Sequence, residues 1–305
     1  MGREAVLLEL PEDLVQRLLA EPLYREQLLR LLLRERLYRP DVRDLETSHS
    51  TRREAQISHP LLRQLQEQAP GTFHHSVIVG NLAERAADLI GADSLLVRVG
   101  AYFHDIGKIA KPGYYIENQM GGANPHDRLD PIASAKMVSE HVRAGMKLTA
   151  RYHVPSRVRA FVPEHHGTRL VTYFYRKAAS QDPMTDPERF RYPGPKPQSR
   201  ETAMVMLADS VEAVVRAAKD RSHDKIDELV DAVINERVTE GQLDECDLTL
   251  RDLRTIADSF KATLRGIYHP RIEYPAPTKA ELAGATTGAG VAYLKPPSEV
   301  DGGVS

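Results

Sequence analysis

The spacing of apolar residues limits the fold of this chain more than any other feature, because it follows the period of an α-helix along most of the sequence. One stripe runs from His75 to Leu89 at three- and four-residue intervals and ends before Gly91, a residue type common just after a helix C-terminus. This stripe predicts that His75 and Leu89 lie on the buried face of a helix. Comparable patterns cover residues 93–107, 131–151, 156–164, 168–179, 199–219, 224–240 and 250–268. No segment alternates apolar and polar residues convincingly, so we predict an all-α fold.

The same reading divides the chain into three parts. The pattern predicts a helical extension followed by a polar linker over residues 1–58, and a helical domain over residues 59–274. Residues 275–305 contain mostly Ala, Gly, Thr, Pro and Ser with few apolar anchors, which predicts a disordered tail. Within the domain, Pro and Gly predict two loops, at 111–127 and 181–198.

Composition argues against several classes of protein. The 305 residues include 41 Lys and Arg against 43 Asp and Glu, which provides no overall basic field for a DNA or RNA duplex. The single cysteine, Cys246, cannot form an internal disulfide and favours a reducing compartment. No apolar run approaches the roughly 18–20 residues of a membrane span, and the N-terminus does not resemble a signal peptide. We therefore expect a cytosolic chain without a membrane span, and the sequence does not indicate its oligomeric state.

Histidine is concentrated in one part of the chain, with nine of the twelve residues between positions 59 and 166. Asp105 follows His104 at the end of an apolar segment, and Asp209 interrupts the apolar run of residues 202–215. A buried ionised carboxylate is costly unless a cation or strong donors compensate its charge, so Asp209 calls for a metal ion or an arginine. The candidate metal ligands are His75, His104, Asp105, His141, His165, His166 and Asp209.

This set of residue types indicates which metals are suitable. Imidazole and carboxylate together suit zinc, iron, manganese or nickel better than calcium, which prefers oxygen ligands alone. The candidate ligands come from different predicted helices, so the metal would lie inside a helical bundle. For any one of these residues a core or capping role is the commoner explanation, whereas the whole set favours metal binding.

Several motifs resemble one enzyme family. His75, the adjacent His104 and Asp105, and Asp209 resemble the H…HD…D signature of HD-domain metal-dependent phosphohydrolases, and residues 104–108 (HDIGK) resemble the HDIG form of its central motif. Segments 59–76, 100–108, 116–127, 164–178, 191–213 and 241–253 are similar to the cytoplasmic HD domain of PgpH-type seven-transmembrane HD proteins, which are bacterial cyclic-di-AMP phosphodiesterases. Those relatives carry an extracellular region and a membrane bundle ahead of the domain. We therefore expect either a soluble relative or a cytosolic piece of a longer protein.

The resemblance implies an HD-domain helical bundle with two divalent transition-metal ions, Mn or Fe, in its core. It assigns His75, His104, Asp105 and Asp209 to one ion, and Asp105, His141, His165 and His166 to the other, with Asp105 as the bridge. Two ions about 3.5–4 Å apart can share a hydroxide that is nucleophilic at neutral pH. The implied reaction is hydrolysis of cyclic-di-AMP to linear pApA, with Asp105 and Lys108 as catalytic residues and Lys108 contacting a phosphate.

The loop at 111–127 is a candidate for holding the bases of this substrate. The residue types in it that can stack on a base or hydrogen-bond to its edge are Tyr114, Tyr115, Asn118, Asn124 and His126. Packing of the two tyrosines on the bundle is an equally weighted alternative. The proline-rich segment 191–197 would form another wall.

Three other functions stay open at this point. An HD phosphohydrolase acting on mononucleotides can work with four ligands and one metal, which would leave His141, His165 and His166 surplus. A cyclic-di-GMP phosphodiesterase of the HD-GYP kind would place a GYP motif soon after the paired histidines, where this chain has GTRLVTYF. A non-catalytic nucleotide sensor would usually have lost metal ligands, and none is missing here.

Overall fold

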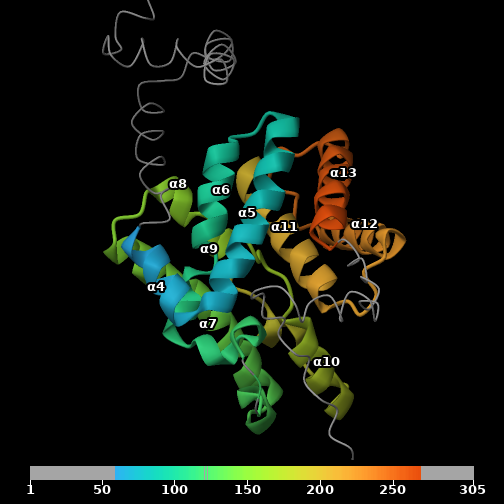
Figure 1. Ribbon diagram of the computed structural model, residues 1–305. Helices are drawn as coiled ribbons and strands as arrows, with labels where there is room; N and C mark the ends of the chain where they lie inside the picture. Colours follow the sequence, from blue (N-terminus) through green and yellow to red (C-terminus); the bar gives the residue numbers. More distant parts are fainter. Residues whose placement is uncertain (1–58, 120, 122, 269–305) are drawn as a thin grey trace, which may run out of the picture. The chain divides into compact units, whose positions relative to one another are not determined.

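The computed structural model describes residues 59–119, 121 and 123–268 (Figure 1). The predictions for residues 1–58 and 275–305 lie outside this part, as does the predicted end of the domain at residue 274. Regular structure in the described residues is helical, without a strand; Leu170 and Arg191 form one isolated antiparallel bridge. The all-α prediction is therefore confirmed. Within the same residues, no helix combines the length and apolarity needed to cross a bilayer.

The helices are labelled as in Figure 1. The α-helices of the described part are α4 (Pro60–Gln68), α5 (Pro70–Ile90), α6 (Ser94–Phe103), α7 (Pro131–Arg151), α8 (Ser156–Arg159), α9 (Phe161–Glu164), α10 (Thr172–Gln181), α11 (Arg200–Ala217), α12 (His223–Thr239) and α13 (Leu250–Ile267). The short 3-10 helices are η2 (Ile106–Ala110), η3 (Pro112–Tyr114), η4 (Ile116–Asn118), η5 (Pro125–Arg128) and η6 (Pro187–Phe190).

Local sequence determines where several of these helices begin and end. The Asp130 carboxylate accepts hydrogen bonds from backbone N–H groups in the first turn of α7. Ser199 and Thr249 each begin a capping box, at α11 and α13 respectively. Gly91 ends α5 with a φ of 69°, a left-handed conformation that favours glycine, as the sequence predicts.

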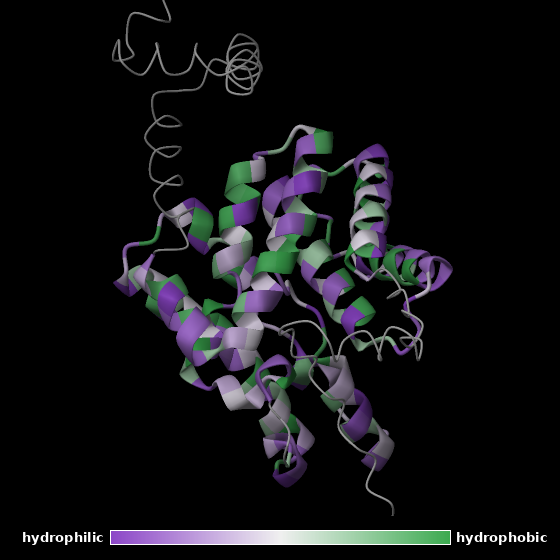
Figure 2. Ribbon diagram, viewed as in Figure 1, coloured by the Kyte–Doolittle hydropathy of each residue, from purple (hydrophilic) through white to green (hydrophobic). Residues whose placement is uncertain are grey.

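The main apolar core lies between α5, α6 and α11, and α12 and α13 pack against α11 and α5 (Figure 1). Its largest apolar side chains include Phe103, Phe161 and Phe260, which are fully buried. Helix α13 is amphipathic, with polar residues along one side and apolar residues along another (Figure 2). Each buried phenylalanine contributes roughly 1.5–3 kcal/mol to stability, so this core provides a firm support for the polar residues between its helices.

A second, smaller apolar cluster holds α10 and η6 against α7. Its buried residues are Ala135, Val171, Phe174, Ala178 and Phe190. The helix predicted over 168–179 begins later than expected, at Thr172. The backbone at Gly167 has a φ of 54°, and the residues after it run to the bridge between Leu170 and Arg191 before the helix starts.

The helix predicted over 93–107 is shorter in the structure, where α6 ends at Phe103 and a turn leads into η2. Successive side chains on an α-helix point about 100° apart, so a continuous helix would separate His104 from Asp105. The turn allows both side chains to face the same point. Leu89, also predicted to be buried, is 60% exposed, although Ala87 in the same turn is fully buried, so neighbouring elements cover only part of the last turn of α5.

Gly107 allows η2 to approach α7 closely, since a Cβ atom there would overlap the carbonyl oxygen of His141 and crowd the backbone of Gly145. We expect Gly107→Ala to lower the free energy of unfolding by about 1–3 kcal/mol, because backbone atoms cannot yield as a flexible side chain can. Urea denaturation of the metal-free protein measures this loss. The matched control is Gly113→Ala, whose Cβ would meet nothing within 4 Å. Equal losses in the two variants would contradict the packing explanation.

Candidate metal centre and adjoining cavity

All seven predicted metal ligands lie together in the core. They form two groups, within each of which the ligand atoms lie no more than 4.8 Å apart: His75, His104, Asp105 and Asp209, and Asp105, His141, His165 and His166. Helices α5, α7 and α11 each supply one ligand, and the other four occur as adjacent pairs at the ends of α6 and α9. Asp105 belongs to both groups, as the resemblance implies.

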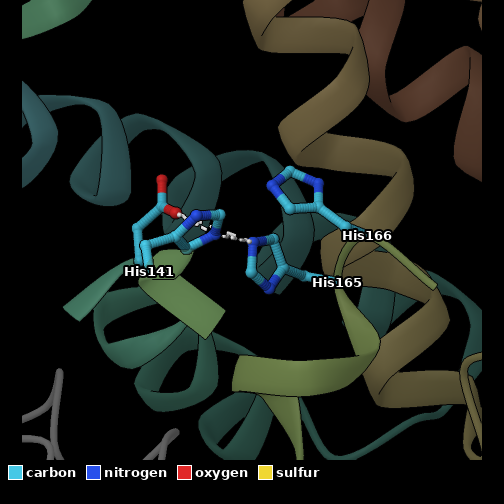
Figure 3. Close-up of side chains that lie close together, drawn as sticks. His141, His165 and His166 are labelled. Atoms are coloured by element: carbon cyan, nitrogen blue, oxygen red, sulfur yellow. Dashed lines mark hydrogen bonds and ion pairs between the residues drawn. The ribbon is translucent and has the colours of Figure 1, made fainter. Parts of the chain in front are cut away.

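The backbone determines which ring nitrogen several of these histidines present. In His104, His141 and His165, the Nδ1–H group donates to the carbonyl three residues earlier, at 2.5, 2.7 and 2.8 Å. This bond leaves the lone pair on Nε2 free for a metal. The Nε2 atoms of His141 and His165 face each other at 3.3 Å, and the ring of His166 lies beside them (Figure 3). Two facing lone pairs repel unless a cation or a proton lies between them.

Several buried polar atoms at this point have no hydrogen-bond partner within the described residues. They include Nε2 of His104, Oδ1 of Asp105 and Nδ1 of His166. Leaving such atoms unpaired in a core costs free energy. All three are metal-donor atoms of the two ligand groups, so a cation bound in each group would satisfy them. The imidazole and carboxylate donors fit a first-row transition metal.

Ionisation of the carboxylates is balanced locally. Burial opposes charge on His75, but hydrogen bonds and the charges of Asp209 and Glu212 outweigh it and raise the pKa of His75 to about 10. Burial also opposes ionisation of Asp105, but the Lys108 ammonium and neighbouring histidines outweigh it and hold the Asp105 pKa well below its ordinary value. At neutral pH Asp105 is therefore ionised, and His75 is protonated on both ring nitrogens. Metal binding would release one of these two protons.

In the group of Asp105, His141, His165 and His166, the pKa values of two imidazoles are lowered, whereas that of His75 in the other group is raised. Burial lowers the pKa of His141 to about 4, with a further contribution from the charge of His165. Burial likewise holds the pKa of His166 well below its ordinary value. Both rings are therefore neutral at pH 7, and neutral imidazole is the form that binds metal.

Lys108 is held at the edge of this centre. Its Nζ lies 2.7 Å from Oδ2 of Asp105 and 2.7 Å from Oε1 of Glu117. Glu117 also accepts a hydrogen bond from Oγ1 of Thr72 at 3.0 Å, which ties the loop to the start of α5. Burial opposes the lysine charge, but the two carboxylates outweigh it and raise the Lys108 pKa. An ammonium has three N–H donors, so one is left for a ligand.

Glu212 is a residue of this site that the sequence analysis did not identify. It is fully buried, and its Oε2 accepts the Nδ1–H of His75 at 2.6 Å, while Nε of Arg216 lies 3.0 Å from its Oε1. A carboxylate behind a ligating imidazole fixes the tautomer and raises the basicity of the ligand. A signal was present in the sequence, because Glu212 follows Asp209 by three residues in the same apolar run and therefore lies on the same side of α11.

A cavity of about 630 Å³ lies beside the centre. The metal-ligand candidates that line it are His75, His141, His166 and Asp209, and the predicted substrate contacts that line it are Lys108, Tyr115, Asn124 and His126. The wall predicted at 191–197 contributes Tyr192, whose ring stacks on that of His166 with centroids 4.1 Å apart. The cavity thus joins the metal centre to the loop at 111–127.

Two of the predicted substrate contacts, Asn118 and Tyr114, are absent from this described lining. The side-chain amide of Asn118 accepts from the backbone N–H of Thr72 at 3.1 Å and donates to its hydroxyl at 2.8 Å. The ring of Tyr114 packs edge-on against His126, a residue of the same loop. These contacts hold the loop in place, and contact of either residue with a base stays a prediction.

The comparisons with known proteins agree with this geometry. Residues 72–214 match the HD domain family. The crystallised HD domain of the phosphodiesterase PgpH from Listeria monocytogenes, in complex with cyclic-di-AMP, is 46% identical to this chain. The match covers 100% of that domain and 70% of this chain, with a TM-score of 0.68. This chain belongs to the HD-domain family. A second structure of the same Listeria domain gives a TM-score of 0.67.

Curated relatives of this HD domain are longer proteins. The cyclic-di-AMP phosphodiesterase PgpH of Bacillus subtilis is 48% identical over 222 residues, 73% of this chain. Its counterpart in Listeria monocytogenes is 47% identical over 221 residues, 72% of this chain. The chain spans 31% of the length of each of these two proteins. The resemblance to PgpH-type HD domains seen in the sequence is thereby confirmed.

We expect Glu212→Gln to weaken metal binding about 10- to 100-fold, because the amide removes the negative charge behind His75. Isothermal titration calorimetry with Mn²⁺ measures the affinity. The control is Glu228→Gln, which changes a carboxylate on α12 that is 67% exposed and paired with Lys225. An unchanged affinity in Glu212→Gln would show that Glu212 does not act through the histidine.

Proposed function

We propose that this domain hydrolyses cyclic-di-AMP to linear pApA at a centre of two divalent transition-metal ions, Mn or Fe. The observation that carries the proposal is the pair of ligand groups that share Asp105 and adjoin a cavity of about 630 Å³. The Listeria HD domain crystallised with cyclic-di-AMP, which is 46% identical to this chain, supports the choice of substrate.

Two bound ions would supply a water activated as a nucleophile at neutral pH and would neutralise the oxygens of the phosphodiester. In the overall reaction, the hydroxyl of water is added to phosphorus, the bond from phosphorus to the 3′ oxygen breaks, and that oxygen takes a proton. The ring opens to a linear dinucleotide with a 5′-phosphate. Asp105 holds the two ligand groups together, and the bonds from Nδ1 to backbone carbonyls keep three of the imidazoles aimed at the centre.

Lys108 is proposed to contact a phosphate oxygen. It lines the cavity, and two of its three donors are already directed at Asp105 and Glu117. Those two contacts hold the ammonium in one place, and its raised pKa keeps it charged. A fixed positive charge beside the metal centre favours a phosphodiester over a neutral ligand.

The loop at 111–127 is proposed to contact a base. The Asn124 side-chain oxygen accepts from the backbone N–H of His126 at 3.0 Å, which leaves its amide nitrogen to donate to a base edge. The ring of Tyr115 packs edge-on against His141, so this tyrosine links the loop to the metal centre.

A cytosolic location and the absence of a nucleic-acid duplex partner stay predictions from composition.

We expect metal content to follow the two ligand groups. Elemental analysis of purified protein should give close to two ions per chain, close to one in His166→Ala and close to none in Asp105→Asn, because only Asp105 belongs to both groups. Circular dichroism checks that each variant is folded. Close to one ion per chain in fully loaded, active protein would contradict the two-ion assignment.

We expect the protein loaded with Mn²⁺ or Fe²⁺ to convert cyclic-di-AMP to pApA, and Lys108→Ala to raise the KM while retaining metal. Chromatography of parallel reactions with cyclic-di-AMP, cyclic-di-GMP and pApA identifies the preferred substrate. A reaction in ¹⁸O-labelled water should place one label in the new 5′-phosphate of the product. Binding of cyclic-di-AMP without cleavage by the fully loaded protein would contradict the proposal and favour a sensor.

A further inference from the structure

The cavity contains cationic residues that the proposed chemistry at the metal centre does not use. Besides Lys108, its lining includes Arg169, Arg216 and Arg237. The charge of Arg216 is compensated, because its Nε lies 3.0 Å from the buried carboxylate of Glu212. Arg169 and Arg237 are less well compensated.

Arg237 projects from α12 and is only 1% exposed, although arginine is among the residues least often buried. Its Nε has no hydrogen-bond partner within the described residues. Its Nη1 lies 2.9 Å from Oε2 of Glu236 and 3.5 Å from Oε2 of Glu240, but makes no hydrogen bond of good geometry to either. The carboxylate of Glu236 is 51% exposed, so water weakens its hold on the buried guanidinium.

Arg169 is also incompletely paired, and it lies close to the metal centre. It follows His166 by three residues, and its Nη1 donates to the hydroxyl of Ser210 at 3.3 Å. Ser210 is the neighbour of the metal-ligand candidate Asp209 on α11. The Nε of Arg169 is buried without a hydrogen-bond partner in the described structure and lies 3.7 Å from Oε2 of Glu240.

These two guanidinium groups therefore share one partly exposed carboxylate, that of Glu240, at the lining of one cavity. Burial and the nearby charge of Arg169 lower the pKa of Arg237, which reflects the same shortage of negative charge. An anion in the cavity would supply it. The planar fork of a guanidinium matches the oxygens of a phosphate, so a phosphodiester is the anion that fits best.

We propose that Arg169 and Arg237 form a subsite for the second phosphodiester of a cyclic dinucleotide, the one that is not cleaved. The inference rests on the proposed function, because a cyclic dinucleotide carries two phosphodiesters and the metal centre engages one. Arg169 lies next to Asp209 through Ser210, so the subsite adjoins the place of the cleaved phosphate. It selects substrates with a second phosphate over those that have only one.

The test compares two substrates in variants of the metal-loaded protein. Cyclic-di-AMP has two phosphodiesters, whereas bis(p-nitrophenyl) phosphate has one and probes the metal centre. Arg237→Met and Arg169→Met each remove one guanidinium. Arg254→Met removes an exposed arginine on α13 that is outside the described cavity lining and serves as the control.

We expect each cavity variant to raise the KM for cyclic-di-AMP roughly tenfold to a hundredfold, the loss typical of one charge-assisted hydrogen bond. The ratio of kcat/KM for cyclic-di-AMP to that for bis(p-nitrophenyl) phosphate should fall by the same factor, while metal content stays as in the unmodified protein. Arg237→Lys should restore part of the affinity, since it keeps the charge without the fork.

Two results would overturn the inference, and they are distinguishable. If the unmodified protein cleaves cyclic-di-AMP and both cavity variants keep the ratio of the Arg254→Met control, the subsite is wrong and the proposed function stands. If the unmodified protein cleaves bis(p-nitrophenyl) phosphate but not cyclic-di-AMP, the proposed function fails and the subsite fails with it. Thermal melting identifies a variant that does not fold; Arg169→Met then decides, because its side chain is less buried than that of Arg237.

Discussion

Two ionised carboxylates, Asp105 and Asp209, lie inside a helical core that is otherwise mainly apolar, and much of the surrounding structure compensates their charge. Neither could stay ionised there alone, because an unpaired buried charge costs several kcal/mol. Lys108 contacts one of them at 2.7 Å, and His75 contacts the other at 3.0 Å. A bound metal cation would compensate most of this negative charge. The buried carboxylates, which would destabilise the fold if left unpaired, are therefore also what attracts a metal to this place.

The backbone around these carboxylates determines the chemistry available to the histidines. Three rings donate Nδ1–H to a carbonyl one turn earlier, so the nitrogen that faces the centre is chosen by the local helix geometry rather than by contact with a ligand. The end of α6 contributes in another way, since the turn after Phe103 aims two consecutive side chains at one point. Gly107 then allows this turn to lie directly against α7, which carries His141.

The cavity extends this logic from the metal centre to its ligand. Negative charge is concentrated at the centre, whereas the cavity lining adds Lys108 and three arginines, of which Arg216 is neutralised by Glu212. Bound cations would balance the carboxylates of the centre, and an anionic ligand would balance the arginines of the cavity. Glu117 and Asn118 of the loop at 111–127 both bond to Thr72 on α5, which positions this part of the loop before any ligand binds.

Much of this site could be predicted from the sequence alone. The period of the apolar residues indicates an all-α fold and buries His75, and the types of seven residues indicate a transition-metal centre, because few other arrangements allow so many imidazoles and carboxylates in a core. Glu212 also left a signal, as a charge three residues from Asp209 in an apolar run. Family resemblance added the division into two ligand groups.

Other features depend on contacts between segments that are distant in sequence, and only the tertiary structure decided them. Periodicity alone suggested a continuous helix through His104 and Asp105 and a buried Leu89, and both expectations were wrong because packing neighbours determine turns and exposure. Packing also decides that Asn118 binds Thr72 and is absent from the described cavity lining, and that Arg237 is buried, which the sequence pattern does not indicate. The sequence by itself determined the helical fold and the kinds of ligand available; the tertiary structure decided which side chains meet, because proximity across helices is set by packing and not by spacing along the chain.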